Sequence, residues 1–210
     1  MFILSKSDFK EFNITNVNSF VECWSKYTSS PANEFGSKKS IDYFSELHLG
    51  GDLSESNVKK LLRWKDTKYL TEIIQSGDSK GQENPRVLKV LENIDSINQF
   101  RNGSICQESF EKITEKIFKT GIVWRAFLYH ISKPLEYPIL DQHVYRVYRY
   151  HVKGNKSEEK LVDINQYIEY CDYFKMLVNE YKAINDIQKL KSLDSALMAY
   201  GQFLNRYDKN

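Results

Sequence analysis

Glycine and proline are scarce in this sequence, with nine and four residues among 210. Both residues interrupt helices and supply the tight turns that join short strands. Their scarcity therefore favours long helices over a sheet of many short strands. The sequence also lacks any apolar run near the roughly 20 residues needed to span a bilayer. Its first residues, Met1 to Lys6, hold too short an apolar stretch for a signal peptide. We therefore expect a cytoplasmic protein with no membrane partner.

Cysteine is almost as scarce, and its three positions are far apart. Cys23, Cys106 and Cys171 are odd in number and include no closely spaced pair. Structural zinc sites and cysteine-ligated clusters need several cysteines, usually at short spacing. We therefore expect no metal, no iron–sulfur cluster and no other cofactor. The three thiols are predicted to be reduced and packed inside a cytoplasmic protein.

Net charge is also small, because 30 basic residues face 28 acidic residues. The distribution along the chain is less even. Between Lys116 and Lys156 lie eight lysines and arginines, opposed only by Glu136 and Asp141, so this segment carries +6 and the rest of the chain −4. Local basicity of this kind suits a surface that faces phosphates. The alternative interpretation is a solvated surface whose sign has no functional meaning.

The apolar residues recur every three or four positions, which is the pattern of amphipathic helices. Ser54 is placed to cap one helix. Pro85 suits the first turn of another, where its missing N–H is not needed. No segment shows convincing strand alternation, so we predict an all-α fold built as a single helical unit over residues 1–210. Helices are expected near residues 17–27, 40–47, 54–62, 69–75, 85–101, 108–118, 122–130, 141–151, 165–181 and 193–203, with an extended connector at 134–138.

The most informative segment runs from Pro138 to Val147. Its core resembles the catalytic-aspartate signature Asp-x-His-Val-x-Arg-Val of the helix-hairpin-helix DNA glycosylases, the relatives of endonuclease III and of the oxidised-guanine and alkylated-base glycosylases. The turn Lys119-Thr120-Gly121 lies about 20 residues upstream of the aspartate, near the family's hairpin. The resemblance implies a two-lobed glycosylase-like fold, with the hairpin and the aspartate-bearing helix at 108–151 and the segments 1–83 and 152–210 packed around them. The signature is matched by Asp141, His143, Val144, Arg146 and Val147.

The sequence departs from the family at the hairpin, which usually reads hydrophobic-Pro-Gly-hydrophobic-Gly. Thr120 replaces the proline and Val123 replaces the second glycine, so the helix-hairpin-helix is degenerate. Arg125 stands where the strand-cleaving members carry a lysine. A guanidinium stays protonated and cannot form a Schiff base. We therefore expect no lysine-dependent lyase activity. The iron–sulfur cysteines of endonuclease III have no counterpart.

Cleavage of an N-glycosidic bond builds positive charge on the sugar, and a fixed carboxylate beside the sugar stabilises that charge. Asp141 is the candidate catalytic residue. An aspartate just before His143 and Val144 is equally an ordinary helix N-cap, and the two roles are compatible. His143 itself is expected to be structural rather than a proton shuttle.

Residues around the hairpin and the aspartate helix are the candidate nucleic-acid contacts. The arginines among them could instead pair with acidic neighbours. Trp124 and Tyr145 could form the walls of a base pocket, since base extrusion needs aromatic or apolar surfaces, although aromatic residues at helical spacing often belong to the core. Trp64 is a weaker candidate for a wedge into DNA. The expected DNA-binding residues are Lys119, Thr120, Gly121, Arg125, Arg146 and Arg149.

Together these observations favour a DNA glycosylase-like protein of base-excision repair. It would bind double-stranded DNA and remove a damaged or modified base by hydrolysis. Two alternatives remain: a non-catalytic DNA-binding protein with the same fold, and a helical protein-interaction module whose basic segment is incidental. Salt-dependent duplex binding separates the last alternative from the other two.

Overall fold

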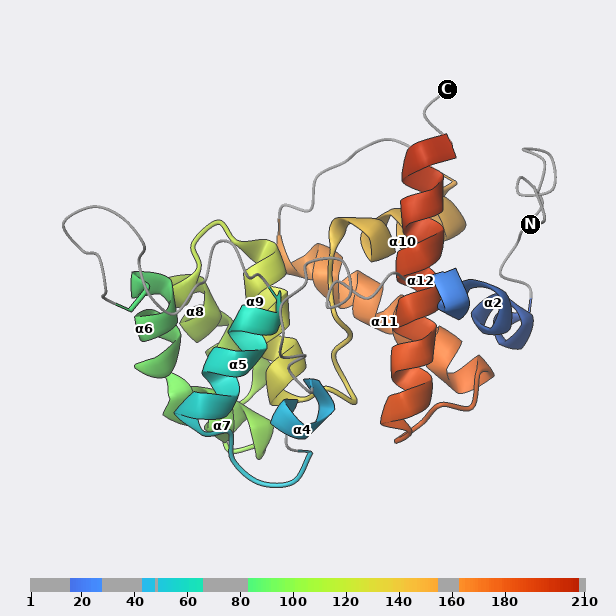
Figure 1. Cartoon of the computed structure of the whole chain (residues 1–210). Helices are drawn as coiled ribbons and strands as arrows, with labels where there is room; N and C mark the ends of the chain where they lie inside the picture. The colour runs from blue at the N-terminus through green and yellow to red at the C-terminus, as the bar shows by residue number, and fades with distance from the viewer. Residues whose placement is uncertain (1–15, 28–42, 48, 66–82, 155–162, 208–210) are drawn as a thin grey trace. The chain divides into compact units, whose positions relative to one another are not determined.

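The computed structural model describes residues 16–27, 43–47, 49–65, 83–154 and 163–207 (Figure 1). These residues form helices and no β-strand, which confirms the all-α prediction for this part of the chain. None of the described helices is long and apolar enough to cross a membrane. The chain divides into two compact units: Met1–Pro31 with Leu135–Asn210 forms unit 1, and Ala32–Pro134 forms unit 2. The predicted segment 108–151 is therefore shared between the two units.

Unit 1 is organised around its last helix, α12, which packs against α10, α2 and η1 (Figure 1). The predicted apolar face of the first helix is confirmed, because its four apolar side chains are buried. Trp24 lies with its ring centroid 5.0 Å from that of Tyr200, and Phe20 meets Tyr200 edge-on at 5.7 Å. The elements of unit 1 are α2 (Val17–Trp24), η1 (Ser25–Tyr27), α10 (Gln142–Lys153), α11 (Ile164–Glu180) and α12 (Ile187–Tyr207).

Helix α12 is longer than the predicted segment 193–203. Asp186 caps it, with its Oδ1 accepting hydrogen bonds from the backbone N–H groups of Gln188 at 3.1 Å and Lys189 at 3.0 Å. Aspartate is a favoured N-cap. The residues after this cap offer fewer apolar side chains than 193–203, so periodicity alone placed the start too late.

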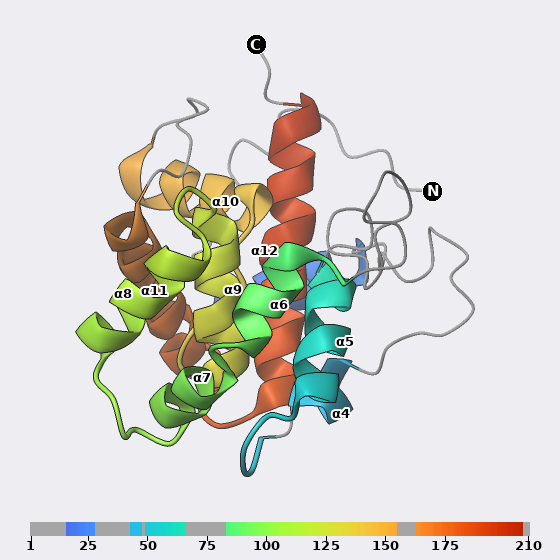
Figure 2. The ribbon, with the colours of Figure 1, turned by 90° about the vertical axis from the view of Figure 1, so that its left-hand side faces the viewer.

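Unit 2 holds the remaining described helices (Figure 2). Phe100 stacks on Phe110 with ring centroids 4.1 Å apart, and Tyr129 meets both rings edge-on. This aromatic cluster joins α7, α8 and α9, whose mutual packing forms the core of the unit. The elements are α4 (Tyr43–Leu47), α5 (Glu55–Lys65), α6 (Pro85–Leu91), α7 (Ile94–Arg101), α8 (Gln107–Ile117) and α9 (Ile122–Ser132).

The single helix predicted at 85–101 is wrong, because α6 ends at Leu91 and α7 begins at Ile94. Asn93 lies at the break. Its side chain donates to the Lys89 carbonyl at 2.8 Å, and its backbone N–H bonds to the Val90 carbonyl at 3.1 Å. An asparagine side chain that bonds to nearby backbone groups competes with the helix. The apolar stripe continues across the break, so periodicity did not reveal it.

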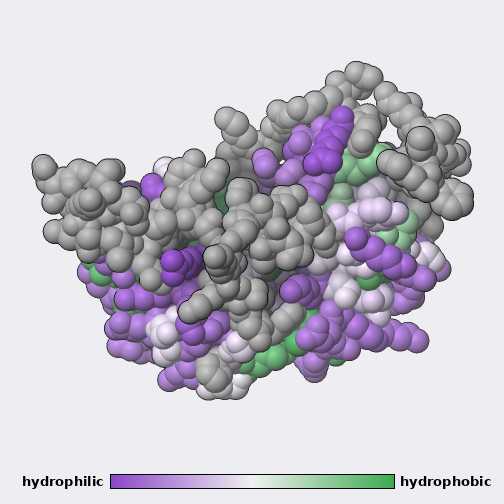
Figure 3. All heavy atoms as spheres, in the orientation of Figure 1, coloured by the Kyte–Doolittle hydropathy of each residue, from purple (hydrophilic) through white to green (hydrophobic). Residues whose placement is uncertain are grey.

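Other expectations near the termini of helices have mixed outcomes. The Ser54 cap is confirmed, because its Oγ accepts from the Asn57 N–H at 3.2 Å. The connector at 134–138 was expected to be extended, but a turn occupies residues 134–136. The predicted helix start at residue 40 and the short helix at 69–75 lie outside the described residues. Hydrophilic side chains cover much of the described surface on the face shown in Figure 3.

Candidate functional site

Residues 133–140 between α9 and α10 form the connector, and Asp141, which follows them, is the N-cap of α10. Its backbone is extended, with φ −144° and ψ 176°. Its Oδ1 accepts from the backbone N–H groups of His143 at 2.6 Å and Val144 at 3.0 Å. The capping interpretation is thus confirmed. Both bonds use Oδ1, and Oδ2 accepts no hydrogen bond from the described part of the chain. The Asp141 side chain is half-buried. The two hydrogen bonds to Oδ1 orient the carboxylate, and the cap does not use Oδ2.

Arg146 lies one turn into α10 and is already engaged. Its Nη1 donates to the Gly201 carbonyl at 3.2 Å and lies 3.1 Å from His143 Nδ1. A guanidinium group can only donate hydrogen bonds, so Nδ1 of His143 must be the acceptor. The proton of the neutral imidazole ring therefore lies on Nε2. Burial is the main cause that lowers the pKa of His143, and the charges of Arg146 and Arg206 lower it further. The Asp141 charge and the Gly201 carbonyl act in the opposite direction and raise it. His143 is therefore neutral near pH 7, in keeping with its expected structural role.

Gly201 marks the point where α12 crosses α10. A Cβ atom at this position would overlap the main-chain carbonyl of His143. The glycine is helical, so close approach rather than a special φ accounts for it. The helix predicted at 193–203 includes Gly201, but the apolar spacing gave no indication of this contact. A lone glycine inside a helical pattern was the signal that could have drawn attention to it.

The predicted hairpin is present as a helix–turn–helix formed by α8, residues 118–121 and α9. Lys119 and Thr120 are exposed in the turn. Gly121 is the N-cap of α9, and its carbonyl accepts from the N–H groups of Trp124 and Arg125, both at 2.9 Å. Its φ is −94°, and an added Cβ would meet its nearest neighbour at an ordinary 3.5 Å. Nothing within the described chain therefore requires glycine here.

The other two arginines proposed to contact DNA are buried. Arg125 is 8% exposed, and its Nη2 lies 3.6 Å from Glu111 Oε1. Arg149 is 3% exposed. A phosphate contact would require each side chain to leave its buried position, so the expectation of a surface role is not supported. Of the basic side chains described between Lys116 and Lys156, only Lys116 and Lys119 are exposed.

The aromatic candidates for a base pocket also have neighbours within the chain. Trp124 is half-buried and stacks on Phe118 at 5.9 Å. Tyr145 is buried, with its ring 5.7 Å from that of Tyr148. Trp64, the candidate wedge into DNA, stacks on Phe127 with ring centroids 6.3 Å apart. Trp124 thus retains some exposed surface, whereas Tyr145 belongs to the packed interior of unit 1.

The three cysteines are free thiols in different environments. Cys171 is buried, as expected, and burial raises its pKa to about 12. Cys23 is half-buried. Cys106 is exposed, which contradicts the expectation that all three are packed. Within the described ranges, no three His, Cys, Asp or Glu side chains gather as a metal ion would need.

One feature that sequence reasoning missed is the anchor of the connector. The hydroxyl of Tyr167, on α11, donates to the Pro138 carbonyl at 2.8 Å in a buried hydrogen bond. The two residues are 29 positions apart, and no sequence pattern links them. The hairpin belongs to unit 2, whereas Asp141 and its anchor belong to unit 1.

Comparison of the chain with models of known protein families, with curated proteins and with solved structures found no match. The resemblance to the helix-hairpin-helix glycosylases therefore rests on the residues named above.

Proposed function

We propose that this chain is a DNA glycosylase-like enzyme that hydrolyses the N-glycosidic bond of a damaged or modified base in double-stranded DNA. The observation that carries the proposal is the state of Asp141. This residue occupies the aspartate position of the signature. Its carboxylate is fixed through Oδ1 by two backbone N–H groups, while Oδ2 accepts no hydrogen bond from the described residues.

The proposed chemistry follows from that geometry. Departure of the base leaves positive charge on the sugar, and a carboxylate that is already oriented stabilises this charge without reorganising. The same oxygen can position a water molecule for attack on the sugar carbon. With Arg125 in place of a lysine, and that arginine buried beside Glu111, no Schiff base forms at this position. The proposed reaction is therefore hydrolysis alone.

The proposed DNA contact starts at the 118–121 turn, where Lys119 and Thr120 are exposed ahead of the N-terminus of α9. Backbone N–H groups at a helix start attract phosphate. The order of hairpin, connector and capping aspartate supports a two-lobed glycosylase-like fold, with Asp141 beside the DNA. That fold belongs to the proposal.

The test is Asp141→Asn, assayed by single-turnover release of alkylated, oxidised or deaminated bases from duplex DNA. Asparagine is also a good N-cap, so the free energy of unfolding should fall by at most about 1 kcal/mol. Loss of the charge should slow base release by on the order of 100-fold or more. DNA affinity should persist or rise, because a negative charge near phosphate has gone.

A matched control is Asp163→Asn. Asp163 caps α11 with a similar backbone, φ −140° and ψ 170°, and its Oδ1 accepts from the Gln166 N–H at 3.1 Å. The two changes are chemically identical, but only Asp141 lies in the signature. Equal base-release rates in all three proteins would make Asp141 a cap and nothing more. DNA binding by the wild type without release of any base would favour the non-catalytic alternative, and absence of DNA binding would favour the interaction module.

A further inference from the structure

We propose that Tyr167 is a positioning residue for the Asp141 carboxylate, acting through the connector; this inference rests on the proposed function. The hydrogen bond of Tyr167 reaches the backbone before Asp141 and not the carboxylate itself. The Tyr167 hydroxyl holds the Pro138 carbonyl, three residues before the aspartate, and so fixes where the connector meets α10.

The connector has little regular structure of its own. Between described residues, no main-chain hydrogen bond involves Pro138 or Ile139. Pro138 has no N–H to donate, so its main chain can form a hydrogen bond only through its carbonyl. A buried carbonyl needs a donor, and Tyr167 supplies one at 2.8 Å. The main chain at Pro138 is therefore held by a hydrogen bond from one side chain of another helix.

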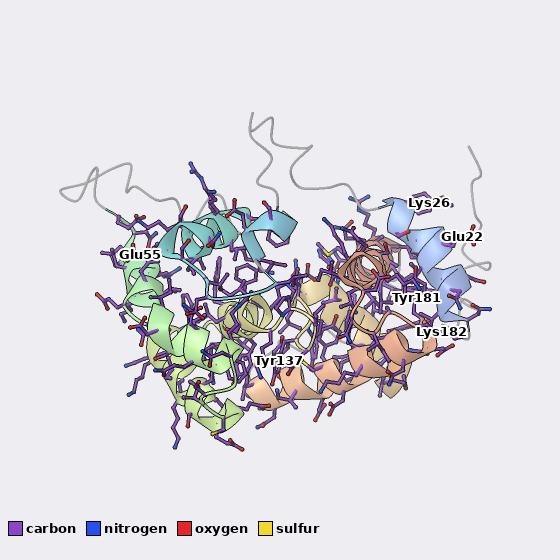
Figure 4. The ribbon with its side chains drawn as sticks, turned by 90° about the horizontal axis from the view of Figure 1, so that it is seen from below. Glu22, Lys26, Glu55, Tyr137, Tyr181 and Lys182 are labelled. Atoms are coloured by element: carbon purple, nitrogen blue, oxygen red, sulfur yellow. The ribbon has the colours of Figure 1, made fainter. Side chains whose placement is uncertain are left out.

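The rest of the connector is packed onto the same anchor. Tyr137, labelled in Figure 4, lies with its ring centroid 6.4 Å from that of Tyr167. Leu140 is buried immediately before the aspartate. The Tyr167 side chain itself is wholly buried, so its hydroxyl cannot swing to solvent. Cys171, one turn further along α11, also forms a side-chain hydrogen bond with Tyr167. The hydrogen bond to the connector is thus a fixed point from which the backbone runs, over three residues, to Asp141.

Misplacement of a catalytic group by about 1 Å costs on the order of 100-fold in rate. Removal of the Tyr167 hydroxyl leaves the Pro138 carbonyl buried without its donor, which favours movement of the connector towards other partners. We therefore expect Tyr167→Phe to slow single-turnover base release by on the order of ten- to 100-fold. The DNA dissociation constant should stay within about twofold of the wild type, because no proposed DNA contact is changed.

The chain offers a close control in Tyr170→Phe. Tyr170 lies one turn further along α11 and is also wholly buried. Its hydroxyl has no hydrogen-bond partner among the described residues. Burial first, the nearby Asp194 charge second and, more weakly, the Asp141 charge raise the pKa of Tyr170, so the hydroxyl is uncharged like that of Tyr167. Tyr170 therefore lies within the electrostatic reach of Asp141 but forms no hydrogen bond to the connector among the described residues. Both variants delete one buried hydroxyl from the same helix, and only Tyr167→Phe releases the connector.

A second readout does not depend on activity. Native-state hydrogen exchange of the His143 and Val144 amides reports how firmly Asp141 caps α10. We expect these two amides to exchange several-fold faster in Tyr167→Phe and at the wild-type rate in Tyr170→Phe. Amides in the middle of α12 serve as an internal reference for global stability.

The outcomes separate the two proposals. If the wild type releases no base but Tyr167→Phe loosens the cap amides, the proposed function fails and the positioning role stands. If the wild type is active and Tyr167→Phe matches Tyr170→Phe in base-release rate and in cap exchange, Tyr167 only fills the core and the inference is overturned. A loss of DNA affinity as large as the loss of rate would also overturn it.

Discussion

At the residue scale, Gly201 has the least room for a side chain among the described glycines. The main chain of His143 lies where a Cβ atom would stand, and a main chain cannot rotate out of the way as a flexible side chain can. Arg146 donates to the carbonyl of the same glycine, so the contact also orients the first turn of α10. The smallest residue in the sequence therefore sets how closely α10 and α12 approach behind the Asp141 cap.

We expect overpacking in Gly201→Ala to cost about 1–3 kcal/mol. The better helix propensity of alanine returns about 1 kcal/mol, so the free energy of unfolding should fall by up to about 2 kcal/mol. Urea denaturation followed by circular dichroism measures the change. Gly50→Ala is the control, because an added Cβ there meets no atom within 4 Å. A Gly201→Ala protein at least as stable as the wild type would show that the two helices can separate freely.

At the element scale, α10 carries a built-in dependence on pH. Its two half-buried histidines, His143 and His151, both have a pKa lowered from the ordinary value of 6.5, chiefly by burial. The charges facing His143 are Asp141 at the N-cap, Arg146 on α10 and Arg206 on α12. Protonation would also remove the lone pair through which His143 accepts from Arg146.

The sign of the effect follows from proton binding. Below pH 6.5 the unfolded chain binds a proton at each histidine while the folded chain stays neutral, so stability falls as the pH drops. Above about pH 7 this loss of stability is absent, because the histidines are neutral in both states. Below that pH each histidine lowers the free energy of unfolding by at most about 1.4 kcal/mol per pH unit. We expect His143→Gln to remove part of the loss of stability between pH 7 and pH 5 in urea titrations. If the variant and the wild type show the same pH profile, His143 does not titrate in this range.

At the scale of the whole molecule, the basic segment is smaller than its sequence suggests. Arg125 and Arg149 are buried, and Arg146 is engaged within unit 1. Lys133 lies over the ring of Phe100, 4.8 Å from its centroid. Exposed positive charge in the described part of this segment is thus concentrated at Lys116 and Lys119, at the end of α8 and in the turn.

We expect the double variant Lys116→Glu with Lys119→Glu to weaken duplex DNA binding and to flatten its salt dependence. Each lost phosphate contact should reduce the slope of log K against log salt by about 0.9. Fluorescence anisotropy across a salt series provides the measurement. The control, Lys26→Glu with Lys89→Glu, makes the same change of net charge at exposed positions outside the segment (Lys26 is labelled in Figure 4). Equal weakening in both variants would indicate attraction by net charge alone, without a hairpin site.

The sequence by itself determined the features that depend on neighbours a few residues apart. Helix class followed from the spacing of apolar residues and from the scarcity of glycine and proline. The caps at Ser54 and Asp141 could be predicted because a capping side chain bonds to N–H groups two or three residues further on. The break at Asn93 and the early start of α12 at Asp186 are local too. They were missed because side-chain bonding, rather than apolar spacing, sets these boundaries.

Tertiary structure alone decided the surroundings of the candidate site. Tyr167 and Pro138 lie 29 residues apart, and Arg146 and Gly201 lie 55 apart. Contacts at such separations depend on how the helices pack, and helical spacing states only which side of a helix is apolar. The same limit applies to Arg125: its charge was visible in the sequence, but its burial beside Glu111 was not. A residue type fixes what a side chain can do, and packing determines which groups it reaches.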